Sequence, residues 1–153
     1  MEIKEGYMPF MGYQTYYRIV GKTEEGKSPI ILLHGGPGST HNYFELLDRV
    51  AESGRAVIMY DQLGCGNSFV EGHPELWTPE TWLNELCMLI DYLHIDHFHL
   101  LGQSWGGMLA IIYLIEKQAK GVKSAILSST LSSSKLWASE QHRMIKFMSE
   151  EDQ

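Results

Sequence analysis

The stretch that decides the fold is residues 98–101, Phe-His-Leu-Leu, followed at once by Gly102-Gln103-Ser104-Trp105-Gly106. The first four residues form a short apolar run typical of a buried strand, and residues 105–117 have the length and apolar character of a helix. The five residues between them match the pattern G-x-S-x-G, in which a sharp strand-to-helix turn exposes a serine hydroxyl at the carboxyl edge of a sheet. We therefore predict that Ser104 is a nucleophile.

Each position of this turn has a physical reason. Gly102 and Gly106 lack a Cβ, which allows the close backbone approach that the turn requires. The helix that follows points its N-terminus at the turn, so the backbone N–H of Trp105 can stabilise a developing oxyanion. Gln103 is expected to support the site. The alternative is a crossover loop of small residues in which Ser104 only caps the helix.

A second glycine-rich segment, His34-Gly35-Gly36-Pro37-Gly38, follows the apolar run Ile30–Leu33. Parallel strands place their carboxyl ends at one edge, so we expect this loop to lie beside Ser104 and to offer backbone N–H groups to an oxyanion. Its glycines, including Gly35 and Gly38, would support the site; the alternative is a plain turn. His34 is expected to order the loop, because the base of a G-x-S-x-G hydrolase follows the nucleophile in the chain.

The rest of the chain alternates strands with helices, which predicts an α/β fold. The predicted strands are Ile3–Phe10, Tyr13–Val20, Ile30–Leu33, 56–60, 98–101 and Val122–Ser128. Three further helices are predicted. The first ends at Gly54 and has apolar positions at Phe44, Leu47, Val50 and Ala51, and the second begins at Thr78-Pro79 and has them at Trp82, Leu86, Leu89 and Leu93. The third spans 135–148, with apolar positions at Leu136, Met144, Ile145 and Met148. This order favours a mostly parallel sheet of about six strands with helices on both faces.

Composition excludes several classes of function. Twelve basic against nineteen acidic side chains give a net charge of −7, and without a basic run we expect no nucleic-acid partner. The longest apolar run, residues 108–115, is too short to span a bilayer, and the first residues lack an apolar signal segment, so we expect no membrane association. Two cysteines, Cys65 and Cys87, are too few for a disulfide framework, which favours a cytoplasmic location.

We expect no cofactor and no metal. His94, His97 and His99 crowd one segment, but with Asp96 as the nearby acid they match no ligand spacing that is typical of a metal site. The turn Gly64-Cys65-Gly66 is not a phosphate-binding loop, because no G-K-[ST] follows it.

Three blocks together resemble the proline iminopeptidase family, serine peptidases of the α/β-hydrolase fold that remove N-terminal proline from peptides. The blocks are residues 32–38, 60–68 and 102–107, and the similarity runs from residue 1 to about residue 146. The resemblance implies that Ser104 is acylated, that the N–H groups of Gly36 and Trp105 form the oxyanion hole, and that the substrates are peptides with N-terminal proline.

The middle block, with the loop 61–68, is expected to support the site. We expect the side chains of Asp61 and Ser68 to form hydrogen bonds with the backbone of this loop. Cys65 has two open interpretations: a thiol that reagents can reach, or a small buried residue.

Members of this family are about twice as long, and their catalytic acid and base follow the nucleophile at a distance. Only 49 residues follow Ser104; they contain one histidine, His142, which we expect to be a polar position on a cap helix. Glu116 and Glu140, the acids before His142, have helical positions that do not suit a triad. We therefore expect an N-terminal half, with 1–131 in the hydrolase core, 132–153 beginning a helical cap, and the triad Asp and His absent.

Such a half would leave Val122–Ser128 as an exposed apolar edge strand, which predicts self-association, pairing with a separate C-terminal polypeptide, or poor solubility. Trp137, Met144 and Met148 would add an exposed apolar patch. Three hypotheses for function stay open: a proline-specific serine aminopeptidase, an esterase or other amide hydrolase of the same fold, and an inactive fragment that acts only as an association module.

Overall fold

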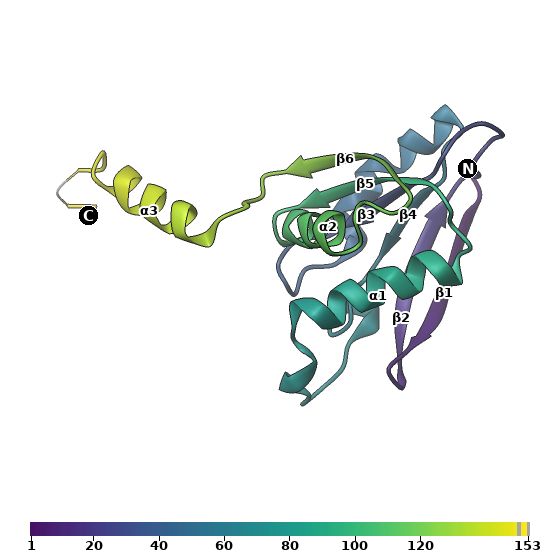
Figure 1. Cartoon of the computed structure of the whole chain (residues 1–153), viewed down its shortest axis with the longest axis horizontal. Helices are drawn as coiled ribbons and strands as arrows, with labels where there is room; N and C mark the ends of the chain where they lie inside the picture. Colours follow the sequence, from purple (N-terminus) through teal and green to yellow (C-terminus); the bar gives the residue numbers. More distant parts are fainter. Residues whose placement is uncertain (150, 153) are drawn as a thin grey trace.

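A six-stranded sheet organises the chain (Figure 1). The computed structural model describes residues 1–149 and 151–152. The strands are β1 (Ile3–Phe10), β2 (Tyr13–Val20), β3 (Ile30–Leu33), β4 (Val57–Tyr60), β5 (Phe98–Gln103) and β6 (Val122–Ser128). The α-helices are α1 (Pro79–Tyr92), α2 (Trp105–Glu116) and α3 (Ser134–Ile145), and the 3₁₀ helices are η1 (His41–Ser53), η2 (Gly66–Ser68) and η3 (Pro74–Leu76).

The strand order, β1-β2-β4-β3-β5-β6, brings four parallel strands together. β3 pairs in parallel with β4 and β5, and β5 pairs in parallel with β6, whereas β2 is antiparallel to both β1 and β4. The carboxyl ends of β3, β4, β5 and β6 therefore meet at one edge of the sheet. The predicted α/β fold with a mostly parallel sheet is confirmed.

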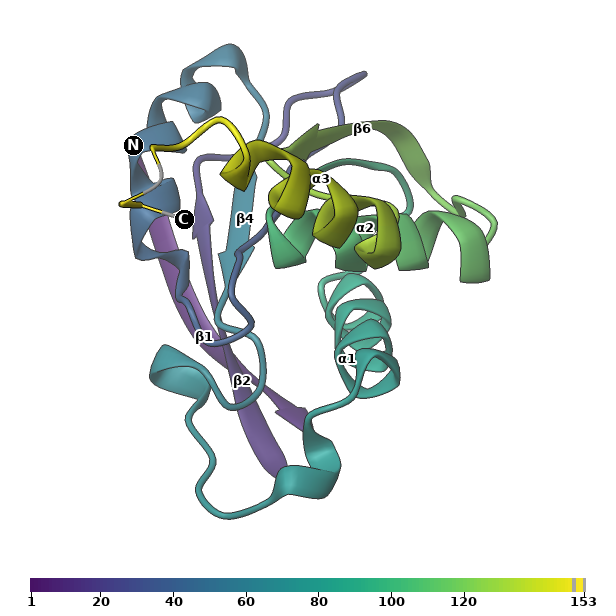
Figure 2. The same ribbon diagram turned by 90° about the vertical axis from the view of Figure 1, so that its left-hand side faces the viewer.

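Helices cover both faces of the sheet, and each face has its own core (Figure 2). The larger core packs α1 and α2 against one face through residues such as Leu86, Leu89 and Leu109, which are fully buried. The smaller core packs η1 against the other face through Phe44 and Ala51. Burial of these apolar side chains is the main favourable contribution to the stability of such a layered fold.

Local sequence signals set several helix ends. The Thr78 hydroxyl accepts a hydrogen bond from the Thr81 N–H, and Pro79 begins α1, as the sequence predicts. Gly54 ends η1 with a left-handed φ of 76°. The prediction for Val50 was wrong: it is exposed, because the buried stripe of η1 runs through Phe44 and Ala51 and leaves Val50 beside it.

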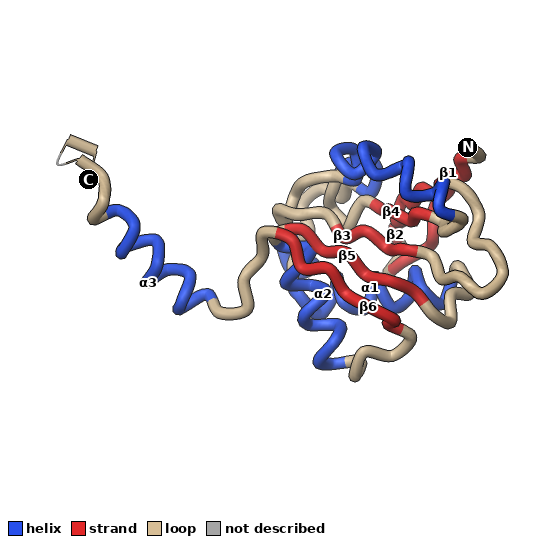
Figure 3. The backbone as a smooth tube through the Cα atoms, turned by 90° about the horizontal axis from the view of Figure 1, so that it is seen from above, coloured by secondary structure: helices blue, strands red, loops and turns tan. Residues whose placement is uncertain are grey.

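β6 is the last strand at one side of the sheet, and α3 follows it in the chain. Ile126 and Leu127 of β6 are half exposed, as predicted for an apolar edge strand. α3 has no buried residue and projects from the body on the segment that follows β6 (Figures 1 and 3). Residues 150 and 153, in the predicted cap segment, lie outside the described residues.

No helix in the described part of the chain is long and apolar enough to cross a membrane.

A carboxyl group is buried in the larger core. Glu85 of α1 has no exposed surface, and it accepts hydrogen bonds from the Thr15 hydroxyl and, at 2.9 and 3.0 Å, from the Leu63 N–H. Burial raises the pKa of Glu85 to about 7, although both hydrogen bonds act in the opposite direction. Glu85 thus ties α1 to β2 and to the loop after β4, and it changes charge near neutral pH.

We predict that Glu85→Gln removes a pH dependence of stability. The pKa of Glu85 is higher in the folded chain than the ordinary 4.5, so the folded state binds more protons and stability falls as the pH rises from 4.5 through 7. The loss is on the order of 3 kcal/mol, at roughly 1.4 kcal/mol per pKa unit. Urea unfolding at pH 5 and pH 8 measures it.

Glu71→Gln, a change at an exposed loop residue, is the matched control and should keep the fall in stability. Parallel pH profiles for the unsubstituted chain and Glu85→Gln would contradict the prediction.

Candidate active site

Ser104 lies at the turn between β5 and α2, with a backbone conformation that few residues adopt. Its φ of 53° and ψ of −118° fall outside the regions that a side chain normally allows. Its N–H donates to the Ser128 carbonyl at 2.9 Å, and its carbonyl accepts from the Thr130 hydroxyl at 2.7 Å and from the N–H groups of Gly107 and Met108. Such strain persists only where surrounding bonds enforce it, and it is concentrated at functional sites.

The two glycines of the turn are required by close backbone contacts. A Cβ at Gly102 would lie 2.2 Å from the carbonyl oxygen of Gly106. A Cβ at Gly106 would lie 1.9 Å from the carbonyl oxygen of Leu33, at the end of β3. The turn therefore presses directly against the strand that leads into the second glycine-rich loop.

The structure brings that loop to Ser104. A Cβ built on Gly35 would lie 3.1 Å from the Ser104 Cβ and 2.5 Å from the Gln103 Oε1. The Gly35 N–H donates to the Tyr43 hydroxyl at 2.7 Å, and this hydroxyl donates to the Gln103 Oε1 at 2.9 Å. Tyr43 thus joins the loop after β3 to the turn after β5, a role that the sequence analysis missed.

The two N–H groups expected to bind an oxyanion have no hydrogen-bond acceptor among the described residues. Among the described residues, neither the Gly36 N–H nor the Trp105 N–H donates a hydrogen bond. Trp105 is the first residue of α2, so the positive end of the helix dipole lies at this point. The Gly38 backbone instead acts on the Cys65 thiol, whose pKa it lowers against the larger effect of burial.

His34 is fully buried and both of its ring nitrogens have partners in the site. Nε2 accepts a hydrogen bond from the Gln62 N–H at 2.9 Å, so the proton is on Nδ1, which donates to the Gly35 carbonyl at 2.9 Å. Burial lowers the pKa of His34, which keeps the ring neutral. These bonds tie the ring to the loops after β3 and β4 and leave no ring nitrogen for Ser104.

The loop after β4 is held by a buried histidine–carboxylate pair that the sequence analysis did not find. Asp61 accepts hydrogen bonds from the ring Nδ1 of His41 at 2.7 Å and from the N–H groups of His41 and Asn67. Burial disfavours the charged form of Asp61, but these hydrogen bonds outweigh it and lower its pKa. Ser68 donates to the Asp61 carbonyl and accepts from the Tyr16 N–H, so the backbone bonds expected for Asp61 and Ser68 are present.

Among the described residues, His142 and the acids Glu116 and Glu140 form no bond with Ser104. His142 is exposed on α3, where its Nδ1 donates to the Ala138 carbonyl at 2.7 Å, and Glu140 pairs with Arg143. Glu116 is the last residue of α2. In the described part of the chain, the Ser104 hydroxyl has no hydrogen-bonded base.

Two small pockets flank the site. One, of about 160 Å³, lies beside Ser104 and is lined by residues from α2, from the segment after β6 and by Trp137 of α3. The other, of about 220 Å³, is apolar and lies between Pro37 and the indoles of Trp77 and Trp82. Cys65 lines this second pocket but is only 5% exposed, and burial raises its pKa to about 11, so the buried interpretation of Cys65 holds.

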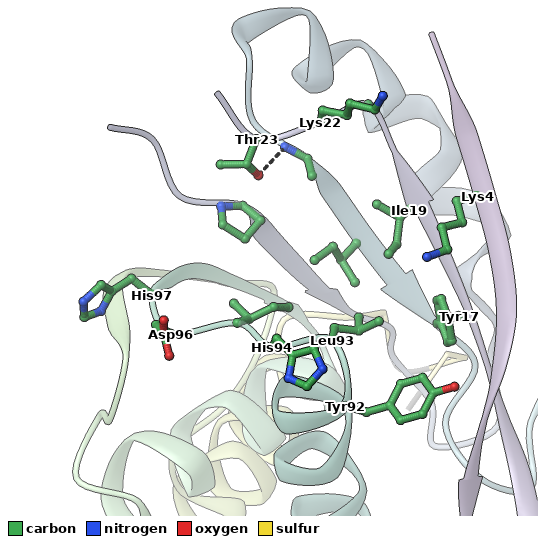
Figure 4. A pocket seen from close by; sticks show the side chains of 15 residues that line it. Lys4, Tyr17, Ile19, Lys22, Thr23, Tyr92, Leu93, His94, Asp96 and His97 are labelled. Atoms are coloured by element: carbon green, nitrogen blue, oxygen red, sulfur yellow. Dashed lines mark hydrogen bonds between the residues drawn. The ribbon is translucent and has the colours of Figure 1, made fainter. Parts of the chain in front are cut away.

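The largest pocket, of about 730 Å³, lies at the opposite edge of the sheet (Figure 4). It is lined by Pro29, Ala56 and His97, which come just before β3, β4 and β5, and by His94 and Asp96. The described residues contain no group of three His, Cys, Asp or Glu side chains that could hold a metal ion. This pocket is therefore separate from Ser104, which lies where the parallel strands end.

The fold and the strained serine turn define the class of protein. Residues 28–151 match the family model for the alpha/beta hydrolase fold, and the chain belongs to this family. It is 69% identical over 153 residues to a proline iminopeptidase of Clostridioides difficile (strain 630) and 63% identical over 155 residues to one of Lactobacillus acidophilus. Each match covers the whole of this chain and 52% or 53% of the relative, so the chain spans about half the length of these curated relatives.

Solved structures agree with this similarity. The proline iminopeptidase of Mycobacterium smegmatis superposes with a TM-score of 0.87 at 32% identity, over 95% of this chain and 50% of that one. The protein VinJ superposes with a TM-score of 0.87 at 36% identity, over 97% of this chain and 51% of that one. The resemblance predicted from the three sequence blocks is confirmed.

We predict that Gly106→Ala disrupts the fold around Ser104. The new Cβ would lie 1.9 Å from the Leu33 carbonyl oxygen, which is backbone and has no free space to move into. We expect a loss of about 3 kcal/mol or more in the free energy of unfolding, the upper range for overpacking. Urea denaturation of the purified chain measures this loss.

Gly26→Ala is the matched control, because Gly26 has a φ of 78° but nothing lies within 4 Å of its added Cβ. It should cost only the roughly 1 kcal/mol of a left-handed alanine. Equal losses for the two variants would show that the close approach to β3 is not the cause.

Proposed function

We propose that this chain carries the nucleophile and the oxyanion hole of a serine aminopeptidase that releases N-terminal proline from peptides. The observation that carries the proposal is the strained Ser104 backbone at the carboxyl edge of the sheet, in contact with Gly35 of the second glycine-rich loop. The choice of proline follows the printed names of the relatives, which are proline iminopeptidases. No cofactor is needed for this chemistry.

The proposed reaction passes through an acyl-enzyme. The Ser104 Oγ attacks the carbonyl carbon of the N-terminal prolyl residue as a base takes its proton, and the carbonyl oxygen becomes an oxyanion. The free N–H groups of Gly36 and Trp105 stabilise that charge, and one such donor is worth roughly 10²–10³ in rate. The oxyanion then collapses and the C–N bond breaks as the base returns its proton to the leaving nitrogen, so the shortened peptide departs as a neutral amine. Water next attacks the prolyl ester and gives a proton to the base, and the base returns that proton to Ser104 as proline leaves.

The base and acid come, in this proposal, from further polypeptide that corresponds to the other half of the relatives. β6 is the last strand of the sheet and has a partner on one side only, so its other side has unpaired backbone groups. Ile126, Leu127 and Trp137 expose apolar surface at the same end of the molecule. A strand that pairs with β6 would cover this surface and bring its own loops to the edge where Ser104 lies.

We also propose a cytoplasmic location. Cys65 and Cys87 are free thiols, which fits a reducing compartment.

We predict that hydrolysis of proline β-naphthylamide requires both halves. The chain alone should show little turnover, because no described side chain takes the Ser104 proton, and addition of the second half of the Clostridioides difficile relative should restore it. Ser104→Ala in the restored complex should lower kcat by about 10³-fold or more. Release of naphthylamine, followed by fluorescence, measures both effects.

Each contrary result has a distinct meaning. Full activity of the chain alone would overturn the need for a second half. Equal cleavage of an acetyl ester and of the prolyl substrate would favour the esterase alternative. A stable complex without activity would leave the association module as the function.

We predict that Ile126→Lys weakens association of the two halves by about tenfold or more. A lysine on an edge strand that must be covered places a charge in an apolar interface. Leu46→Lys on η1 is the control, since Leu46 is 85% exposed and η1 packs on β4 and β3 rather than on the edge strand. Titration of activity against the concentration of the second half gives the apparent Kd, and equal values for both variants would place the interface elsewhere.

A further inference from the structure

Gln62, in the loop directly after β4, has no exposed surface, and three of its hydrogen bonds go to the two glycine-rich segments. Its backbone N–H donates to the His34 Nε2 at 2.9 Å, and its side-chain Nε2 donates to the His34 carbonyl at 2.9 Å. Its Oε1 accepts a hydrogen bond from the indole Nε1 of Trp105 at 2.8 Å. The two ends of one amide group therefore hold two segments that are 71 positions apart in the chain.

These two segments are the two halves of the proposed oxyanion hole. His34 precedes Gly35 and Gly36 in the loop after β3, and its ring is bonded to the Gly35 carbonyl. Trp105 follows Ser104 and supplies the second N–H. A shift of either end of the Gln62 amide would thus change the distance between the two oxyanion donors.

We propose that Gln62 is a positioning residue, which fixes the spacing of the Gly36 and Trp105 N–H groups. The inference rests on the proposed function, because it assigns a role within the same site. An amide is the side chain that offers a donor to a carbonyl and an acceptor to an indole at the same time. Burial makes each bond costly to lose, since no water replaces a missing partner.

The surroundings hold Gln62 itself in place. The next residue, Leu63, donates its N–H to Glu85 and accepts a hydrogen bond from the Trp82 indole at 3.1 Å. The Trp82 ring also packs edge-on against Trp105, with 5.2 Å between ring centroids. Gln62 is therefore anchored to α1 from one side and holds the oxyanion donors on the other.

The first test compares Gln62→Met with Ser68→Ala. Methionine keeps the length of the side chain but loses both amide bonds. Ser68 is a buried residue of the same loop whose bonds go to Asp61 and Tyr16, away from the oxyanion donors, so its loss tests a purely structural role. The readouts are the free energy of unfolding of the chain and, in the complex restored with the second half of the Clostridioides difficile relative, the rate constant for modification of Ser104 by a fluorophosphonate. In that reaction Oγ gives its proton to the base and displaces fluoride at phosphorus.

We expect Gln62→Met to slow the modification by about tenfold or more, whereas Ser68→Ala should change it less than about twofold, although both destabilise the chain. Equal rates for the two variants would overturn the inference.

Gln62→Glu adds a pH dependence that a structural role does not explain. A protonated carboxyl can donate to the His34 carbonyl and accept from the Trp105 indole, so it reproduces both bonds. The carboxylate loses the donor and faces the carbonyl oxygen. We expect the ratio of two rate constants for modification, that of Gln62→Glu over that of the unsubstituted chain at the same pH, to fall by about tenfold as the carboxyl ionises. A ratio that stays constant with pH would contradict the proposal.

A measurement that does not depend on the reactivity of Ser104 separates this inference from the proposed function. In ¹H–¹⁵N spectra, Gln62→Met should shift the backbone amide signals of both Gly36 and Trp105, and Ser68→Ala should leave them in place. Absence of any modification of Ser104 in the restored complex of the unsubstituted chain would contradict the proposed function, and the spectra of the chain alone would still decide the role of Gln62. If neither amide signal shifts, or only one of them does, the positioning role of Gln62 is overturned.

Discussion

The contact between the serine turn and the end of β3 is the constraint on which the rest of the site depends. α2 can begin directly after Ser104 only because Gly106 has no Cβ to collide with the Leu33 carbonyl. That approach forces Ser104 into its unusual φ and ψ, and it brings the first N–H groups of α2 beside the loop that begins at His34. Two strands thus contribute to one edge of the sheet, with Ser104 after β5 and the glycine-rich loop after β3.

Below this edge lies a continuous layer of buried polar groups. His34, Gln62 and the Trp105 indole are bonded in sequence, while Asp61 with His41 and Glu85 with Leu63 hold the loop after β4 from two sides. The side chains of this layer are buried, so each bond satisfies a polar group that would otherwise lack a partner. A buried network in which the partners are satisfied favours one arrangement over others, because each alternative leaves a polar group without a partner. The free N–H groups of Gly36 and Trp105 are therefore backed by a hydrogen-bonded layer.

The sequence allowed the fold and the two glycine-rich loops to be predicted, because their signals are local. Alternating apolar runs mark the strands, Thr78-Pro79 marks the start of α1, and G-x-S-x-G places Ser104 at a strand-to-helix turn. Gln62, Tyr43 and His41 could not be assigned in this way, since each has a partner between 20 and 60 positions away, namely Trp105, Gln103 and Asp61. A single polar residue carries no periodicity that reveals its burial. The burial of Glu85 was likewise hidden, because it follows from how α1 packs over the loop after β4.

The end of β6 and the segment after it form two hydrogen bonds with the backbone of Ser104. The Ser128 carbonyl and the Thr130 hydroxyl hold the two sides of the Ser104 peptide, and the same few residues lead into α3. A partner that binds α3 or β6 therefore contacts the same segment that holds the Ser104 backbone in place. Thermodynamic linkage makes this relation reciprocal: if docking of a partner at β6 tightens the binding of an inhibitor to Ser104, the inhibitor strengthens docking by the same factor. Occupancy of the serine site and assembly at the sheet edge then form one coupled equilibrium.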